Sequence, residues 1–163
     1  MGKSEDKTNV MRILDQKKIP YFPHGYEHED GEPVDAISAA TKLGKDPDDL
    51  FKTLVTKGNK GGIFVFVIPG SKELDLKKAA KAAGEKSIEM IKVSELLSIT
   101  GYIRGGCSPL GMKKQFPTFL DQSAQNHETI FVSAGKIGKQ VELSPEDLIS
   151  LTHGKYDNLI IDP

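Results

Sequence analysis

Two runs rich in β-branched and aromatic residues, Lys52 to Thr56 and Ile63 to Ile68, are separated only by the segment KGNKGG. Residues of this kind favour strands. The glycines between them supply the positive φ angles that a tight connection requires. The pattern predicts a β-hairpin, the clearest in the sequence, so any fold of this chain has to be built around a sheet.

Helical spacing of apolar residues appears on both sides of this hairpin. Val10 and Leu14 lie on one face of a first helix, which should end near Lys18 because Pro20 lacks a backbone donor. A second helix covers Ala36 to Leu43, with Asp35 as N-cap and Gly44 as the stop.

The later helices follow the same rules. DLKKAAKAAG has a stripe of Leu76 and alanines and should end at Gly84, and Ser94 to Thr100 is a brief helix. In SPEDLISLTHG, Ser144 is the expected N-cap, Pro145 occupies the first turn and Gly154 is the expected stop.

Four further segments have the composition of strands: Ser87 to Ile91, Thr118 to Leu120, Thr129 to Ser133 and Gln140 to Leu143. Many neighbouring strands are joined by turns, which favours a mixed or curled sheet flanked by helices over a regular doubly wound fold. The expected class is therefore mixed α/β (α+β). With no repeat or linker, we expect one domain over residues 1–163 with its core at about 8–161.

Charge and cysteine content limit the function. The 22 basic and 23 acidic side chains leave a net charge of −1, so overall charge does not indicate a nucleic-acid partner and any basic surface must be local. One cysteine, Cys107, excludes an intramolecular disulfide and fits a reducing compartment. No apolar run approaches a membrane span, so we expect a soluble, cytoplasmic protein without a membrane partner.

The densest local signal is GYIRGGCSPLGMKK, from Gly101 to Lys114. Its glycines and proline cannot lie inside a helix at low cost, and glycines let backbone N–H groups approach a ligand. The segment is either a structural turn or a loop shaped around a ligand. It is neither a P-loop nor a dinucleotide-binding fingerprint, because the required spacing and flanking elements are missing.

At this point the sequence resembles the YbaK-type deacylases, which are related to the editing domain of bacterial prolyl-tRNA synthetase. The resemblance covers about Val10 to Ile161 and is carried by KIPYFPHGYEH, FKTLV, LDLKKAAKAAG, TGYIRGGCSPLGMKK and TIFVSAGKIGKQVEL. It implies a compact α/β domain with a partly barrel-like mixed sheet. The implied activity is removal of an amino acid from mischarged tRNA, chiefly cysteine from the tRNA for proline.

The resemblance also assigns functional positions. Lys52, the lysine of FKTLV, would contact the substrate end of the tRNA, although a strand lysine is otherwise usually solvated. Gly105 and Gly106 would approach the aminoacyl group, with Ser108 and Pro109 completing the loop. These loop residues are equally compatible with an ordinary turn.

Two further positions follow from the same resemblance. Ser133 matches the serine of the family's VSGGK turn, and its alternative role is a hydroxyl that bonds to the backbone. Tyr26 could stack on the terminal adenine, or could be a plain surface or core tyrosine.

This chain departs from the family pattern in three places. Asp35 and Ala36 stand near the place where the family usually has a Phe-Gly pair. Ala134 replaces the first glycine of VSGGK, and Cys107 replaces an aliphatic residue. The first departure bears on the amino-acid specificity and not on the type of reaction.

No cofactor or metal is expected. His24 and His28 are four residues apart, but Gly25 and the preceding Pro23 make a zinc-binding HExxH-type helix improbable. No histidine adjoins a serine or cysteine as in a catalytic triad. Loop N–H groups together with Lys52 would then stabilise the oxyanion, while water, a ribose hydroxyl or the substrate thiol attacks.

The expected partners are the acceptor end of mischarged tRNA and prolyl-tRNA synthetase, and the protein is expected to be monomeric. Two other functions stay open: an editor specific for alanine, and a non-catalytic module of the same fold. Lysines around the third helix and after the glycine loop could contact acceptor-stem phosphates, or could be ordinary solvated charges; they are Lys72, Lys77, Lys78, Lys81, Lys86, Lys113 and Lys114.

Overall fold

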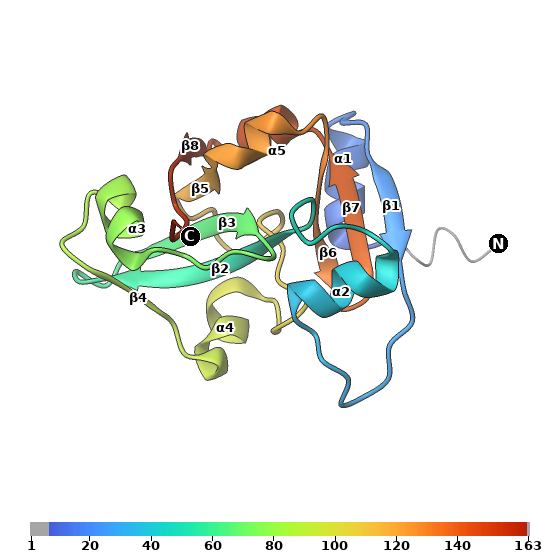
Figure 1. Cartoon of the computed structure of the whole chain (residues 1–163), viewed down its shortest axis with the longest axis horizontal. Helices are drawn as coiled ribbons and strands as arrows, with labels where there is room; N and C mark the ends of the chain where they lie inside the picture. Colours follow the sequence, from blue (N-terminus) through green and yellow to red (C-terminus); the bar gives the residue numbers. More distant parts are fainter. Residues whose placement is uncertain (1–6, 163) are drawn as a thin grey trace.

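The computed structural model describes residues 7–162. Short helices and strands alternate along the chain (Figure 1). Each α-helix is eight residues long, and none in the described range is long and apolar enough to cross a membrane. The elements are α1 (Asn9–Gln16), β1 (Phe22–Gly25), α2 (Ala36–Leu43), β2 (Phe51–Gly58), β3 (Ile63–Pro69), α3 (Leu76–Ala83), β4 (Ile88–Met90), α4 (Val93–Thr100), β5 (Thr118–Asp121), the 3₁₀-helix η1 (Gln122–Asn126), β6 (Ile130–Lys136), β7 (Lys139–Leu143), α5 (Pro145–Thr152) and β8 (Lys155–Asp157).

The strands form two sheets. Three antiparallel strands are ordered β1-β7-β6, and five are ordered β4-β2-β3-β5-β8. In the larger sheet β2 pairs antiparallel with β3 and β4, whereas β5 pairs parallel with β3 and β8. A parallel bridge between Leu50 and Phe131 joins the two sheets, which do not close into a barrel within the described residues. The predicted mixed α/β architecture and the hairpin are confirmed, with two linked sheets in place of one.

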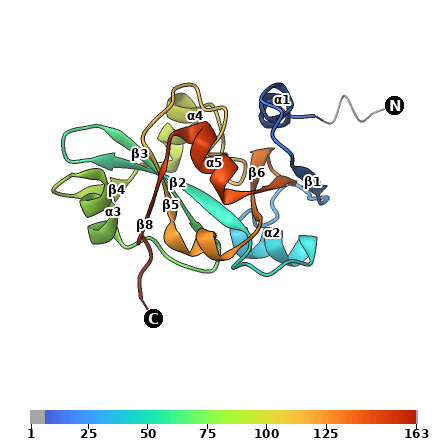
Figure 2. The same cartoon turned by 90° about the horizontal axis from the view of Figure 1, so that it is seen from above.

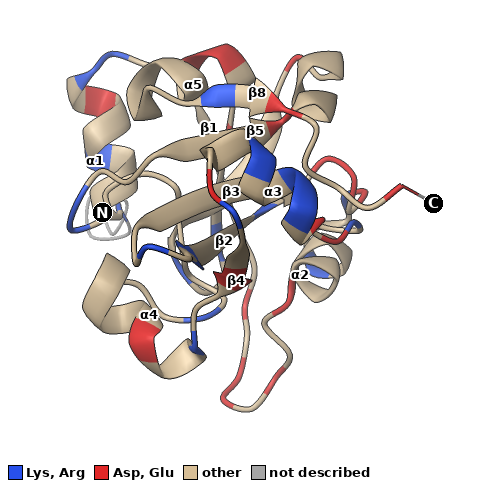
Figure 3. Ribbon diagram, turned by 90° about the vertical axis from the view of Figure 1, so that its left-hand side faces the viewer, with Lys and Arg blue, Asp and Glu red and all other residues tan. Residues whose placement is uncertain are grey.

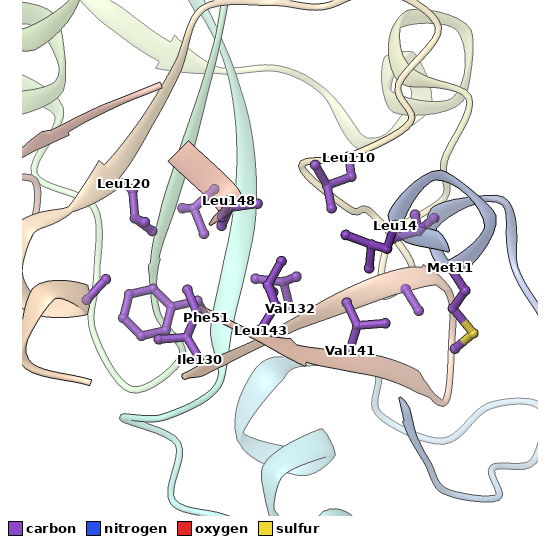
Figure 4. Packing of buried hydrophobic residues seen from close by; sticks show 14 of the residues in the cluster. Met11, Leu14, Phe51, Leu110, Leu120, Ile130, Val132, Val141, Leu143 and Leu148 are labelled. Atoms are coloured by element: carbon purple, nitrogen blue, oxygen red, sulfur yellow. The ribbon is translucent and has the colours of Figure 1, made fainter. Parts of the chain in front are cut away.

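One large apolar cluster holds the sheets and two helices together (Figure 4). Leu14 of α1 and Leu148 of α5 pack against it from outside the sheets. The larger sheet contributes Phe51 of β2 and Leu120 of β5, and the smaller sheet contributes Leu143 of β7. All five side chains are at most 1% exposed, so both sheets share a single core. Figures 1 and 2 place α1 and α3 at opposite ends of the molecule.

Most predicted helix ends are confirmed by their caps. The Asp35 carboxylate accepts from the Ser38 N–H, and Gly44 is left-handed with φ 69°. The prediction for α5 was wrong at its end: the left-handed residue is His153, with φ 55°, and Gly154 follows it. In α3 the buried stripe is narrower than expected, because Leu76 is 42% exposed.

Two strands and the 3₁₀-helix were not predicted. β1 contains Pro23, and it is an edge strand, where the missing N–H leaves no ladder bond unmade. β8 has three residues and depends on its parallel partner β5. Both strands owe their existence to a partner that is distant in sequence, so local propensity could not reveal them.

Candidate active site

A pocket of about 380 Å³ lies where the two sheets meet. Its walls are the N-terminal part of α2, the start of β2, the turn after β3, the loop at 104–107, and one residue each from β6 and β7. Its floor is buried, whereas its mouth is formed by the exposed lining residues. The mouth residues are Asp35, Ile37, Ser71, Glu73 and Arg104.

Lys52 brings a positive charge into this pocket. It is the second residue of β2 and is half-buried, and its Nζ donates to the Gly70 carbonyl oxygen at 3.3 Å. Within residues 7–162 the ammonium group forms no ion pair with a carboxylate. An ammonium group has three donors, so Lys52 can still donate to a bound molecule.

The glycine loop enters the pocket through a tight turn. The Gly106 N–H donates to the Ile103 carbonyl at 3.0 Å, and Gly105 has φ 87°, as the third position of a type II turn requires. A Cβ on Gly105 would also lie 2.5 Å from Cβ of Val34. Only glycine fits this position, for both conformational and steric reasons.

The two glycines therefore have different roles. Gly105 lines the pocket, whereas Gly106 is buried behind it, where an added Cβ would lie 3.1 Å from the Ile137 nitrogen. The Gly106 amide is engaged in the turn, so the expectation that it donates to an oxyanion is not supported by the geometry. In the described part of the chain, the amides of Gly105 and Cys107 form no hydrogen bond and are the better donors.

Cys107 also lines the pocket, but its thiol is not activated. Burial raises the pKa of Cys107 to about 12, so the sulfur is protonated near neutral pH. A thiol in this state is a poor nucleophile. The side chain contributes size and shape to the pocket.

β6 and β7 supply polar groups to the floor. Ser133 and Gln140 are cross-strand partners, and both line the pocket. The Ser133 hydroxyl accepts from the Gly135 N–H at 3.1 Å, which leaves its own proton available. Gln140 is only 4% exposed, and its Oε1 has no hydrogen-bond partner within residues 7–162.

Thr53, the neighbour of Lys52 on β2, also has a buried oxygen without a hydrogen-bond partner in the described part of the chain. The atom is Oγ1, and Thr53 also lines the pocket. Burying an oxygen without a partner is costly, so such atoms in a pocket indicate a place where a ligand donates. Thr53 and Gln140 were not predicted as site residues, because a polar residue in a strand usually faces solvent and only the sheet register places these two inside.

Three of the predicted site residues do not line the described pocket. Tyr26 packs against α2, with Lys42 Nζ 5.6 Å from its ring centroid. Ser108 is fully buried, and its Oγ accepts from the Leu110 N–H at 3.2 Å, so it shapes the loop from behind. Pro109 is buried beside it.

The histidines do not assemble into a site. His24 lies 2.9 Å from Glu142 through its Nε2, while the His28 ring lies near Gly138. Among the lining residues of the described pocket there is no histidine. The histidines thus offer no base to Ser133 or Cys107.

Two carboxylates reach the mouth of the pocket. Asp35 is occupied by the cap of α2, and its hydrogen bonds to Ser38 hold the pKa of this carboxyl below its usual value. Glu73 is exposed, and its carboxylate makes no hydrogen bond within the described residues. Glu73 is therefore the group that a mechanism with attacking water would use as base.

Three of the eight residues of α3 are lysines, and the helix is coloured largely blue in Figure 3. Lys78 is committed elsewhere, because its Nζ donates to the Ile160 carbonyl at 2.7 Å and pairs with Asp162 at 3.1 Å. It ties down the C-terminal segment and is not available as a phosphate contact. Lys77 and Lys81 remain exposed on the same helix.

The site as a whole combines two cations, Lys52 inside and Arg104 at the mouth, with unengaged backbone amides and buried acceptors, and its described residues include no activated nucleophile. Such a pocket defines a class of protein that stabilises negative charge on a bound carbonyl group by electrostatic means. Residues 31–151 match the family described as the aminoacyl-tRNA editing domain. The chain belongs to this family, which confirms the enzyme class predicted above, an aminoacyl-tRNA deacylase.

Individual relatives agree with this assignment. The chain is 53% identical over 154 residues to "Putative Cys-tRNA(Pro)/Cys-tRNA(Cys) deacylase EbsC" of Enterococcus faecalis, covering 94% of this chain and 93% of that protein. It is 32% identical over 100 residues to the proline–tRNA ligase of Shouchella clausii, covering 61% of this chain and 17% of the ligase. A solved structure described as "a putative trans-editing enzyme for prolyl tRNA synthetase" superposes with a TM-score of 0.79 at 23% identity, covering 94% of this chain and 95% of that one.

Proposed function

We propose that this protein removes cysteine from mischarged Cys-tRNA(Pro), acting in trans, and that it can also act on Cys-tRNA(Cys). The observation that carries the proposal is the arrangement of Lys52 and the Gly105 and Cys107 amides around one pocket. These donors can stabilise the oxyanion that develops on an ester carbonyl. The 53% identical relative, whose name contains both substrates, supports the choice of cysteine.

We propose that the thiol of the esterified cysteine is the attacking group. The sulfur bonds to the carbonyl carbon and loses its proton, the ester C–O bond breaks, and the ribose oxygen takes up a proton from solvent. Cysteine leaves as a cyclic thioester by intramolecular acyl substitution, so the step consumes no water and the enzyme would formally be classed as a lyase. Intramolecular attack gains several kcal/mol from proximity, and the pocket offers no activated nucleophile as an alternative.

The size of the pocket favours selection of cysteine by the reactivity of its thiol and not by its shape. A volume of about 380 Å³ exceeds what a cysteine side chain needs. Small differences in side-chain size are worth only about 1–3 kcal/mol in a binding pocket, so shape alone would admit alanine and serine as well. The substrate thiol provides the discrimination that the walls do not.

The test compares cysteinyl-, seryl- and alanyl-tRNA for proline at equal concentration. We expect rapid loss of cysteine and at least about tenfold slower loss of serine and alanine, since a hydroxyl is scarcely ionised and a methyl group cannot attack. Equal rates for serine and cysteine would show that water or a ribose hydroxyl attacks. Preferential loss of alanine would indicate an alanine editor, and release of none of them would indicate a non-catalytic module.

The Glu73→Gln variant sharpens this comparison. If the substrate thiol attacks, the variant should keep the rate on cysteinyl-tRNA within about twofold, since Glu73 lies exposed at the mouth. A loss of about a hundredfold, the size of a general-base contribution, would instead favour attacking water.

We further propose that residues 1–163 act as one domain, as a monomer in the cytoplasm, and that prolyl-tRNA synthetase presents the mischarged acceptor end. The resemblance to part of a proline–tRNA ligase supports this partnership. Adding the synthetase should lower the KM for cysteinyl-tRNA without changing kcat, because a partner that delivers substrate adds binding and not chemistry.

A further inference from the structure

The mouth of the pocket carries an arginine, Arg104. Arg104 is exposed and lines the pocket, and within residues 7–162 its guanidinium makes neither an ion pair nor a hydrogen bond. The chain has 22 basic residues but only two arginines, Arg104 and Arg12. Arg12 lies exposed on α1 and does not line the pocket.

The backbone at Arg104 is part of a turn that a hydrogen bond closes. Arg104 is the second residue of the type II turn that the Gly106 N–H closes on the Ile103 carbonyl. The next residue, Gly105, has Val34 and Ile137 so close that an added Cβ would meet both. The guanidinium therefore extends from a hydrogen-bonded turn, adjacent to the Gly105 amide that the proposed function assigns to the oxyanion.

The chemistry of the substrate defines what this guanidinium can bind. In an aminoacylated RNA end the amino acid's carboxyl group is esterified and neutral, and its amino group is positive. The anion nearest to the ester is the phosphodiester on the 5′ side of the terminal ribose. A guanidinium matches the oxygens of a phosphate in bidentate geometry, which an ammonium group cannot do.

We propose that Arg104 binds this last phosphodiester of the RNA and so positions the terminal ribose and its ester over Lys52. This inference rests on the proposed function, and it adds a ligand group and a residue that the resemblance did not assign. Arg104 is a positioning residue, because its contact lies one ribose away from the bond that breaks.

The test uses two small cysteinyl esters that differ in this single phosphate. One is the cysteinyl ester of adenosine, and the other is the cysteinyl ester of the dinucleotide cytidylyl-adenosine, each corrected for its spontaneous loss. For wild-type protein we expect kcat/KM to be about tenfold higher with the dinucleotide, since a charge-assisted contact is of that size. Arg104→Ala should lose this advantage and should match wild type on the adenosine ester.

Two further variants complete the design. Arg104→Lys should restore only part of the dinucleotide advantage, because it keeps the charge but loses the bidentate geometry. Arg12→Ala removes the other arginine and should behave as wild type. The effect in Arg104→Ala should fall on KM and leave kcat nearly unchanged.

The outcomes separate this inference from the function on which it rests. If wild type cleaves both esters and Arg104→Ala keeps the full dinucleotide advantage, the phosphate contact is wrong while the deacylase proposal stands. If Arg104→Ala loses activity equally on both esters, the residue acts on the loop and not on a phosphate, which also overturns the inference. If wild type cleaves neither ester, the deacylase proposal itself fails, and the inference fails with it.

Discussion

Lys52 is the side chain on which the proposed chemistry depends most. Replacing it by alanine should lower deacylation of cysteinyl-tRNA by at least about tenfold, because the variant lacks a cation next to the developing oxyanion. Lys57→Ala on the same strand is the matched control, since Lys57 pairs with Glu95 at 3.7 Å away from the pocket. Single-turnover rates measure the effect, and wild-type activity in Lys52→Ala would refute the site.

Gln140 should show opposite effects on stability and on activity. Leucine is similar in size and removes the unpartnered Oε1 from a position that is only 4% exposed. Gln140→Leu should therefore unfold at the same or a higher temperature, while its kcat/KM falls about tenfold, because a lost contact to substrate costs about 1.4 kcal/mol or more. Thermal melts and deacylation assays decide; a variant that loses stability but keeps its activity would show that Gln140 is merely structural.

The thiol of Cys107 should be nearly inert. Since the pKa is raised to about 12, the thiolate that reacts with iodoacetamide appears only as the pH approaches that value. At pH 8 the folded protein should be alkylated far more slowly than the same protein in urea, which exposes the chain's one cysteine. Cys107→Ala should stay active, and its inactivity together with a covalent intermediate in wild type would contradict the proposed mechanism.

At the scale of elements, the glycine loop depends on close contact as well as on backbone conformation. Gly105→Ala should destabilise the protein by about 1–3 kcal/mol and abolish activity, because alanine meets both a φ of 87° and the Val34 side chain. Gly61→Ala has a similar φ of 91°, but its Cβ meets nothing within 4 Å. The free energies of unfolding of the two variants, measured in urea, should differ by the cost of the contact with Val34.

The double variant Gly105→Ala, Val34→Gly separates the two causes. Because the atom nearest to the added Cβ is Cβ of Val34, only Val34→Gly removes the clash; relative to the single variant Val34→Gly, adding Gly105→Ala should then cost about as much stability as Gly61→Ala. Equal stabilities for Gly105→Ala and Gly61→Ala would show that the loop moves freely away from Val34.

Helix ends and the hairpin were predictable because their causes are local. The Asp35 cap, the left-handed Gly44 and the KGNKGG turn act within a few residues. The end of α5 was misplaced by one residue, because the left-handed residue that ends the helix is His153 and not the expected stop, Gly154.

At the scale of the molecule, both sheets should unfold together. Leu120 of β5 and Leu143 of β7 are each 1% exposed in the same apolar cluster. Truncating either one to alanine should cost about 2–5 kcal/mol and lower the midpoint of one shared transition. Circular dichroism and fluorescence should report the same midpoint, and two separated transitions would contradict both the shared core and the single domain proposed above.

The sequence by itself determined the mixed α/β class, most of the elements and, through the resemblance, the candidates Lys52, Gly105 and Ser133. These three do line one pocket. Turn glycines, caps and strand composition express preferences of neighbouring residues, and such preferences can be recognised without knowing where the chain goes.

Tertiary structure alone decided the division into two sheets, the inward placement of Thr53 and Gln140, and the position of Tyr26, Ser108 and Pro109 outside the pocket. A one-residue change of register would turn each strand residue to the opposite face, so which polar groups enter the pocket depends on pairing between segments that are far apart in sequence. Tertiary structure also decided which loop N–H groups can donate to a ligand. The Gly106 N–H cannot, because in the folded turn it donates to the Ile103 carbonyl.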